Sequence, residues 1–393
     1  MPYKKILEIA DILNGFAFQS KRYVENGIRV IRIANVQDGK IVDEQPCFYP
    51  SETRNEIEKY MLKEGDLLVS LTGNVGRVGL IPRDMLPAAL NQRVCCLRLK
   101  KDNIDLKYLF LYLRRKDFVR ECIKASKGVA QLNLSTKWLE NYEIPLPSLS
   151  EQKRIVDKIE ELFSELDSAV ETLKKTKEQL AVYRQSVLKS AFEREEDGKF
   201  LKIKDFANVG TGATPLKTRQ DYYNGNIAWV SSGKVNDKKI YTPTTFITEK
   251  ALEETNCSVY PVHTIVVAMY GEGKTRGQCA ELMIDAATNQ ALAAIVLQDN
   301  SVICKDFLLW FLTFNYEELR RKAAGGVQPN LNLNLVKNIS VPYYDMDMQM
   351  KIVSEIESKL TVCENIEKTV NEALIQANAM RQSILKKAFE GGL

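Results

Sequence analysis

The segment RQSVLKSAFE at residues 184–193 returns as RQSILKKAFE at residues 381–390, with eight of its ten positions identical. The two copies lie 197 residues apart, about half of the chain's 393 residues. The same spacing joins Gly128, Gln131, Asn133, Leu134, Asn141, Pro145, Gln152, Ile155, Val156 and Ile159 to Gly325, Gln328, Asn330, Leu331, Asn338, Pro342, Gln349, Ile352, Val353 and Ile356. A spacing of 198 joins Gly73, Gly79, Asn91 and Gln92 to Gly271, Gly277, Asn289 and Gln290. Such a repeat predicts one structural unit used twice, a tandem repeat with approximate two-fold symmetry.

The first part of each unit has a mixed pattern. Short segments rich in β-branched residues and bounded by glycine or aspartate predict strands at residues 28–36, 66–71 and 93–99. Residues 108–126 have helical spacing and stop before a glycine, as do their counterparts at residues 307–324. We therefore expect each unit to begin with a small mixed α/β (α+β) domain, called a head below.

The second part of each unit predicts one long helix. Ser148 can cap its start, and Glu151 three residues later completes a capping box. Apolar residues then recur at alternating steps of four and three over more than four heptads, which is the pattern of a coiled-coil seam. The predicted seam residues are Ile155, Ile159, Leu162, Leu166, Leu173 and Leu180 in the first copy, and Ile352, Ile356, Ile366, Val370 and Ile384 in the second.

The two long helices are expected to pack against each other, because neither can bury its apolar stripe within a small head. The link from the first helix to the second head, near residues 195–199, is short and charged, which favours an antiparallel pair. The predicted boundaries place the first head at residues 1–147 and its helix at 148–199, followed by the second head at 200–347 and its helix at 348–393. Two heads on an antiparallel helical pair suit the recognition of two separated sites on one linear polymer.

Composition excludes several classes of protein. Hydrophobic residues at 45% and charged residues at 27% are typical of globular domains. The sequence has no run of about 18 apolar residues and no signal-peptide pattern, so it predicts a cytoplasmic protein. Eight cysteines without a CxxC pair predict reduced thiols rather than zinc ligands or disulfides. The single histidine, His263, is interpreted as a structural surface residue, which leaves little room for a metal site or for histidine catalysis.

Three features shared by the heads supply candidate contacts to DNA. Glycine-rich loops at residues 71–79 and 268–276 allow close backbone approach to phosphate. Asn-Gln pairs can bind adenine edges, but the favoured interpretation is that their side chains hydrogen-bond to buried backbone groups. Glycine turns follow basic helix ends. The first head has a net charge of +6, whereas the whole chain has a net charge of +4. The candidate DNA-binding residues are Thr72, Asn74, Arg77, Asn91, Gln92, Lys124, Lys127 and Gln131 in the first head, and Lys274, Thr275, Arg276, Asn289, Gln290, Arg320, Arg321 and Gln328 in the second.

Two other classes of protein stay open on these residues alone. AMYGEGKT at residues 268–275 follows an apolar strand and resembles a relaxed P-loop, in which Lys274 and Thr275 would serve a nucleotide and magnesium. The equivalent loop of the first head has no Lys-Thr pair, so a nucleotide-binding enzyme is the weaker alternative. A coiled-coil scaffold that joins two protein partners is the other. No nucleophile–histidine pair or methyltransferase motif is found, and we expect no catalytic residues.

The stretch IPLPSLSEQKRIV at residues 144–156, together with the loop SLTGNVGRVGL at residues 70–80 and the duplicated head-and-helix plan, resembles the specificity (S) subunits of type I restriction–modification systems. The resemblance covers the whole chain, although Met348-Gln349-Met350 replaces the EQK of the first copy. It implies that each head is a target recognition domain reading one part of a bipartite, asymmetric DNA sequence.

The resemblance also implies partners. The helices would set the gap between the two parts of the target and dock two modification (methyltransferase) subunits, and restriction subunits, the ATP-dependent translocase and nuclease, would join them. S-adenosylmethionine, ATP and magnesium are expected on those subunits, with no cofactor or metal bound by this chain. The resemblance thus predicts a non-catalytic subunit of a DNA-modifying and DNA-cleaving complex.

Overall fold

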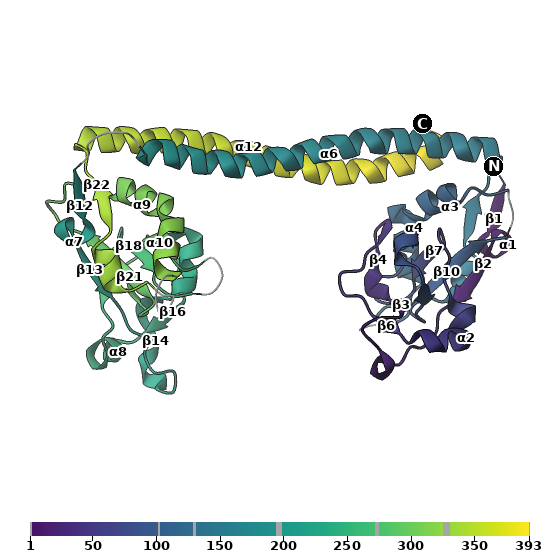
Figure 1. Cartoon of the computed structure of the whole chain (residues 1–393), viewed down its shortest axis with the longest axis horizontal. Coiled ribbons are helices and arrows are strands. Elements are labelled where there is room, and N and C mark those ends of the chain that lie inside the picture. Colours follow the sequence, from purple (N-terminus) through teal and green to yellow (C-terminus); the bar gives the residue numbers. More distant parts are fainter. Residues whose placement is uncertain are drawn as a thin grey trace. The chain divides into compact units, whose positions relative to one another are not determined.

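The structure is a computed structural model, which describes residues 2–100, 103–128, 131–193, 199–271, 275–324 and 331–392. It divides into two compact units (Figure 1). One unit holds Met1–Lys174 and Asn371–Leu393, and the other holds Lys175–Val370. Each unit therefore contains one head, one end of the first long helix and one end of the second.

The first head is built on two small sheets. An antiparallel sheet has the order β2-β10-β7-β8, and a three-stranded sheet has the order β6-β3-β9 with β3 parallel to β9. Their bounds are β2 Ala10–Asn14, β3 Ile28–Ile31, β6 Phe48–Tyr49, β7 Leu67–Ser70, β8 Val78–Leu80, β9 Ala88–Leu90 and β10 Val94–Leu99. A hairpin of β4 (Val36–Gln37) and β5 (Lys40–Ile41) and short helices α1 (Ile6–Ile9), α2 (Arg54–Ile57) and α5 (Thr136–Glu140) complete the head.

Strand alternation separates two cores in this head. Leu67 and Val69 of β7 face the helices α3 (Leu106–Leu113) and α4 (Lys116–Ala125), where they join one buried cluster. Leu68 between them belongs to a second cluster with Ile31 of the three-stranded sheet. Because successive side chains of a strand point to opposite faces, β7 is buried on both sides, which explains its unbroken apolar run.

The second head repeats this plan. Its main sheet has the order β13-β21-β18-β19-β15, in which the first four strands take the places of β2-β10-β7-β8, and a second sheet has the order β16-β14-β20-β17. The bounds are β13 Ala207–Thr211, β14 Tyr223–Val230, β15 Lys239–Ile240, β16 Thr245–Ile247, β17 Val259–Tyr260, β18 Ile265–Ala268, β19 Cys279–Leu282, β20 Ala286–Thr288 and β21 Leu292–Leu297. The helices of this head are α7 Ile203–Phe206, α8 Glu249–Glu254, α9 Lys305–Phe314, α10 Tyr316–Ala324 and α11 Leu333–Lys337. The mixed α/β heads predicted from the repeat are thus confirmed.

The single helix expected over residues 108–126 is wrong in one respect, because two helices occupy that stretch. Arg115, which separates α3 from α4, has an extended backbone (φ −66°, ψ 140°), and Asn315 ends α9 before α10 begins. The same break in both heads turns one amphipathic pattern into two short helices that cover the sheet.

The ends of each head pair with each other before the chain enters a long helix. Strand β1 (Tyr3–Lys5) pairs with β11 (Glu143–Pro145), and β12 (Phe200–Lys202) pairs with β22 (Ser340–Pro342), both antiparallel. The long helices α6 (Leu149–Phe192) and α12 (Met346–Phe389) follow directly. The Ser148 hydroxyl accepts a hydrogen bond from the Glu151 amide at 3.3 Å, as predicted, whereas the Glu151 carboxylate binds Arg154 and leaves the capping box half formed.

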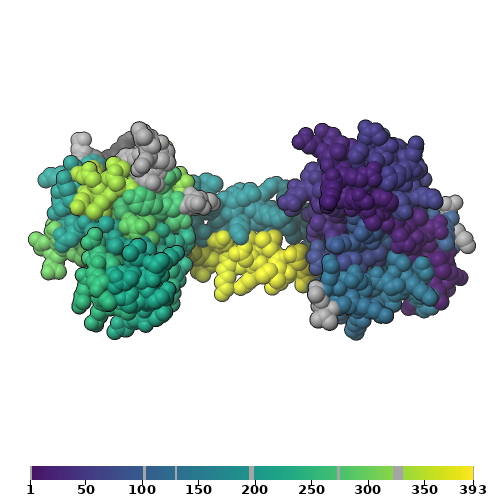
Figure 2. Space-filling view, turned by 90° about the horizontal axis from the view of Figure 1, so that it is seen from below, coloured from purple at the N-terminus to yellow at the C-terminus, as the bar shows by residue number. Residues whose placement is uncertain are grey.

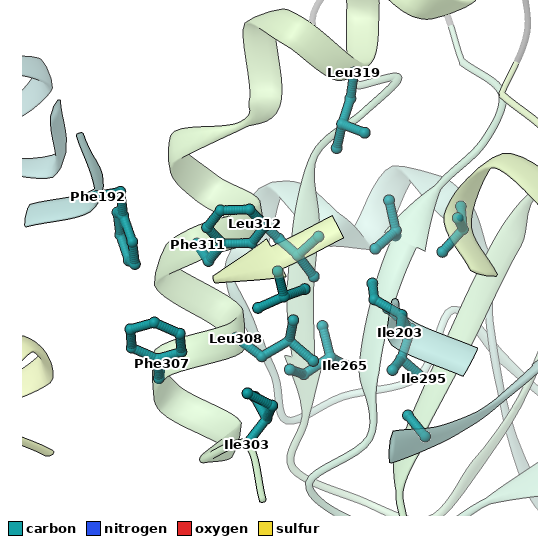
Figure 3. Packing of buried hydrophobic residues seen from close by; sticks show 14 of the residues in the cluster. Phe192, Ile203, Ile265, Ile295, Ile303, Phe307, Leu308, Phe311, Leu312 and Leu319 are labelled. Carbon is teal, nitrogen blue, oxygen red and sulfur yellow. The ribbon is translucent and has the colours of Figure 1, made fainter. Parts of the chain in front are cut away.

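Contacts within each unit make the two helices antiparallel. In the first unit, Ile155 and Ile159 near the start of α6 share a buried cluster with Leu385 near the end of α12. In the second unit the end of α6 meets the start of α12, and Phe192 also packs edge-on against Phe307 and Phe311 of α9, with ring centroids 5.4 and 5.5 Å apart (Figure 3). The predicted antiparallel coiled coil is the arrangement that buries both stripes.

The predicted seam residues differ in burial. Those that are buried are Ile155, Ile159, Leu166, Leu180, Ile352, Ile356 and Val370, and those that are half-buried are Leu162, Leu173 and Ile384. Ile366 is 40% exposed, because the stripe of α12 there runs through Cys363, Val370 and Ala377, one heptad apart. Ion pairs flank the seam, between Arg381 and Asp167 in the first unit and between Arg184 and Glu367 at 2.8 Å in the second.

A buried glutamine fastens each long helix to its head. In α6, the Gln152 side-chain oxygen accepts from the Asp105 amide at 2.8 Å, and its nitrogen donates to the carbonyls of Asn103 at 3.1 Å and Pro147 at 2.9 Å. The Gln152 side chain is fully buried, and these bonds satisfy its amide group together with three backbone groups.

Gln349 of α12 repeats this arrangement. Its oxygen accepts from the Cys304 amide at 2.7 Å, and its nitrogen donates to the carbonyls of Val302 and Tyr344, both at 2.8 Å. Gln349 is also fully buried. The two glutamines join the loop before α3 or α9 to the first turn of the long helix in each repeat, and are called the glutamine clamps below.

We predict that Gln152→Ala destabilises the first unit by about 3 kcal/mol, because it removes three hydrogen bonds and leaves three partly buried backbone groups without their partner. Hydrogen exchange of the Asp105 amide should accelerate in the full-length variant, and the midpoint of urea unfolding should fall. Gln349→Ala should do the same at the Cys304 amide. Gln185→Ala, at an exposed position of α6, is the matched control, and unchanged exchange at Asp105 in Gln152→Ala would contradict the clamp.

Candidate nucleic-acid interface

The glycine loop of the first head is a tight turn between β7 and β8. The Ser70 amide donates to the Arg77 carbonyl and the Gly76 amide donates to the Ser70 carbonyl, both at 2.9 Å. The Ser70 hydroxyl donates to the Asn74 carbonyl at 2.6 Å. Gly76 has φ +78°, and a Cβ there would lie 2.9 Å from the Cys122 sulfur of α4. The loop thus requires glycine both for its backbone conformation and for its close approach to the helix.

This loop pairs with the turn that follows α4. Thr72 forms a β-bridge with Asn133, and the Gly73 amide donates to the Leu132 carbonyl at 2.8 Å. Thr72 is 8% exposed, which places it inside this junction. Two segments about 60 residues apart in sequence, both predicted as DNA contacts, therefore form one surface.

Asn74, Arg77 and Gln131 meet at a polar hollow of about 520 Å³. The Arg77 Nη1 donates to the side-chain oxygen of Gln37 at 2.8 Å, which holds the guanidinium in place. Arg32, which lines the same hollow, donates to the Gln45 carbonyl at 2.8 Å. Guanidinium and amide groups in one hollow can donate to and accept from the edges of base pairs.

Arg32 and Gln37 were not among the residues predicted from sequence. They lie in the segment between β3 and β5, where no repeated motif or glycine marked them. Lys124 and Lys127 are exposed at the end of α4 and in the turn after it, where they add positive charge to this head.

The Asn-Gln pairs occupy turns that join the two sheets. The Asn91 amide donates to the Ile31 carbonyl at 3.1 Å, and the Asn289 amide donates to the Val230 carbonyl at 3.0 Å. A Cβ on Gly15 would lie 2.2 Å from the Asn91 carbonyl, so the strands approach closely here. Gln92 is exposed, and the side-chain oxygen of Gln290, also exposed, accepts from the Thr214 hydroxyl at 2.5 Å.

The corresponding loop of the second head is only partly described, since Lys274 lies outside the described residues. The Gly277 amide donates to the Ala268 carbonyl, and the Ala268 amide donates to the Gln278 carbonyl. These are the bonds that Gly76 and Arg77 make in the first head. The spacing of 198 predicted Gly277 as the counterpart of Gly79, which is wrong. Gly277 is the counterpart of Gly76, because the loop of the second head is three residues longer.

This alignment of the two loops also changes the interpretation of Thr275 and Arg276. Gln278 takes the place of Arg77, while Arg276 and Thr275 are half-buried in the inserted part of the loop. The P-loop alternative rests on residues 272–274, which lie outside the described residues.

The basic residues at the end of α10 differ from one another. The Arg320 guanidinium donates to the Tyr316 hydroxyl at 2.8 Å and lies 5.4 Å from the centre of that ring, beside Gly277. Arg321 is exposed. Gln328 lies outside the described residues.

His263 is an exposed residue that contacts the buried carboxylate of Glu281. Its Nδ1 lies 2.7 Å from the Glu281 carboxylate, which also binds Lys305 and is 2% exposed. Burial raises the pKa of Glu281, but the hydrogen bonds from Lys305 and His263 outweigh it and hold that pKa below its ordinary value. These contacts tie the loop before β18 to the first turn of α9.

The cysteines and acidic residues offer little other chemistry. All eight cysteines are free thiols, and burial raises the pKa of Cys95 to about 12 and that of Cys279 to about 11. Within the described parts of the chain, no three histidine, cysteine, aspartate or glutamate side chains gather as a metal site would need. In those same parts, no helix combines the length and apolar character needed to cross a membrane.

Comparison with known proteins places this architecture in a family. Residues 1–180 and 195–376 each match the type I restriction modification DNA specificity domain. The chain belongs to that family and carries two copies of its domain, as the sequence resemblance predicted.

Among its relatives is the EcoBI specificity subunit of a type I restriction enzyme from Escherichia coli, which is 27% identical over 423 residues covering 98% of this chain and 84% of that protein. The MjaVIII specificity subunit of Methanocaldococcus jannaschii is 32% identical over 188 residues, which is 47% of this chain and 43% of the relative.

Two solved structures have the same fold. A chain from a study of the assembly and conformational transition of a type I R-M system has a TM-score of 0.75 at 18% identity, and the match covers 100% of this chain and 98% of that one. The HsdS subunit of Thermoanaerobacter tengcongensis has a TM-score of 0.60 at 18% identity, covering 100% and 97%.

Proposed function

We propose that this chain is the non-catalytic DNA-specificity subunit of a type I restriction–modification complex, in which each head reads one part of a bipartite, asymmetric target. The observation that carries the proposal is a shared framework with divergent surfaces. The strands that the two main sheets share keep the same order, and both heads use the same glutamine clamp, whereas Gln278 replaces Arg77 and the glycine loop differs by three residues. Two heads with one framework and different exposed side chains are suited to reading two different sequences.

The hollow of the first head is the proposed surface for base contacts. Arg77 is held by Gln37 and lies beside Asn74 and Gln131, so three types of polar side chain are presented together. The exposed Lys124 and Lys127, with the head's excess of basic residues, would bind the phosphates nearby. The counterpart surface in the second head lies around Gln278 and Arg321.

The long helices have two proposed tasks, setting the gap between the two parts of the target and docking two modification subunits. Figure 2 shows residues of α6 in teal and of α12 in yellow at the surface of the molecule. Tyr183 and Met380 occupy equivalent positions of the repeat and are 46% and 54% exposed. Large apolar residues on an outer helical face, once in each copy, fit two identical protein partners.

The remaining parts of the complex follow from this role. S-adenosylmethionine, ATP and magnesium would bind to the modification and restriction subunits rather than to this chain, and the complex would act on DNA in the cytoplasm. The reduced thiols agree with that compartment. A coiled-coil scaffold would need no divergence of polar residues between the two heads, and it is not favoured.

We predict that Arg77→Ala weakens binding of the cognate duplex by about 2 kcal/mol, or roughly thirtyfold, because a guanidinium fork that reads a base edge is lost. Methylome sequencing of a host with the variant and its modification subunits should show relaxed choice at one position of one half-site. Arg83→Ala, an exposed arginine outside the hollow, should leave the methylated sequence unchanged. An unaltered methylome in Arg77→Ala would argue against this role for the hollow.

We also predict that Tyr183→Glu or Met380→Glu each removes one modification subunit from the assembled complex, and that the double variant removes both. A carboxylate on a buried apolar contact would be desolvated without a partner. Native mass spectrometry of co-expressed complexes measures the stoichiometry. Gln185→Glu adds the same charge at an exposed position two residues from Tyr183 and should leave two subunits bound. Two subunits on the double variant would refute this docking surface.

A further inference from the structure

The second head contains a cavity of about 430 Å³ between α9 and the edge of its main sheet. The apolar part of its lining, called the floor below, is formed by Leu309 and Trp310 of α9, Cys279 of β19 and the ring of Tyr316. Polar groups stand at its rim: the lysines Lys238 and Lys239 and the amides Asn236 and Gln278. An apolar, aromatic cavity with a few polar groups is the usual form of a small-ligand site.

The same place in the first head is filled by Arg114. The glutamine clamps set the register between the heads, because Gln152 binds the Asp105 amide and Gln349 binds the Cys304 amide. Nine residues after these amides stand Arg114 in the first head and Thr313 in the second. A Cβ on Gly39 would lie 2.4 Å from the Arg114 guanidinium carbon, so that group covers the hairpin of β4 and β5. The Thr313 side chain is too short to cover the corresponding segment, so the cavity is open in the second head.

The hairpin residue beneath Arg114 has also changed. Gly39 stands two residues before Ile41, and Lys238 stands two residues before Ile240, where the second head continues its sheet. Both have positive φ, +77° for Gly39 and +58° for Lys238. Lys238 combines this φ with ψ −45°, which a residue with a side chain rarely adopts. The second head thus keeps a cation at a strained position where the first keeps glycine, and such strain gathers at ligand sites.

We propose that this cavity binds one nucleotide, with its base on the floor formed by Leu309, Trp310 and Tyr316 and its phosphate on Lys238 and Lys239. Aromatic side chains stack on any base, and lysines bind phosphate as point charges. None of the described residues that line the cavity is a carboxylate, so nothing in the lining repels a phosphate.

A free nucleotide and an unstacked nucleotide of a DNA strand present this same chemistry. The amides of Asn236 and Gln278 stand at the rim, within the lining, where a base edge can hydrogen-bond to them. The site shares no residue with the loop at 268–275, and within its lining only Gln278 also belongs to the proposed DNA-reading surface.

The test is isothermal titration calorimetry on the purified full chain with four probes: the deoxynucleoside 5′-monophosphates, the parent nucleosides, a single-stranded hexanucleotide and a duplex. We expect one monophosphate to bind per chain. Thr313→Arg, which rebuilds the plug of the first head, should weaken binding at least tenfold. Asn365→Arg, at an exposed position of α12, adds the same charge elsewhere and should leave binding unchanged.

Lys238→Gly is the second variant, because it restores the residue of the first head and relieves the backbone. It should weaken monophosphate binding at least fivefold, leave nucleoside binding unchanged and leave or raise the thermal unfolding temperature. Binding of the hexanucleotide as well as the monophosphate would identify a strand as a source, and binding of the monophosphate alone would identify a free nucleotide; either supports the site. No binding of any probe at 10 mM, taken as roughly the weakest measurable affinity, or equal binding by Thr313→Arg, would overturn the proposal.

Discussion

The buried glutamine at the start of each long helix is the interaction on which the rest of the structure depends. Gln152 and Gln349 each satisfy three backbone groups, two in the head and one in the segment that enters the helix. A shift of the helix by one residue would leave the fully buried side-chain amide without these partners, which is costly. The clamp therefore fixes the start and direction of the helix relative to its own head. A helix whose start is fixed to its head can set a defined distance along its length.

Divergence between the repeats follows the same physical division. The residues that hold the framework are kept, as with the glutamine clamps and the left-handed Gly76 and Gly277. The residues that face solvent have changed, as with Arg77 and Gln278. The exchange of Arg114 for Thr313 goes further, because it alters the shape of the head and leaves a cavity in the second copy. The two copies thus differ in shape as well as in the side chains that they present.

The sequence predicted the features that depend on periodicity and missed those that depend on juxtaposition. The tandem repeat, the two heads and the antiparallel helices follow from spacing, because apolar heptads report directly on burial. The break at Arg115 was missed, since an amphipathic pattern continues across it. The loop register failed because an insertion of three residues is invisible beside repeated glycines.

Asn74, Arg77 and Gln131 were predicted as DNA contacts, but the sequence could not show that they meet in one hollow or that the second head has a cavity, because each gathers residues from distant segments. Arg77 and Gln37 are 40 residues apart, and Lys238 and Trp310 come from different elements of the second head. Gln349 did carry a signal, as it is the one residue that survives where Met348-Gln349-Met350 replaces EQK.

The central claim is that heads select bases while clamped helices set the gap between them. The most direct measurement inserts one heptad into both helices, within residues 165–180 and 362–377, and sequences the methylome of a host that carries this chain with its modification subunits. Seven helical residues add about 10 Å, or roughly three base pairs. We expect a gap enlarged by about three base pairs with both half-sites unchanged. An unchanged gap, or altered half-sites, would contradict it.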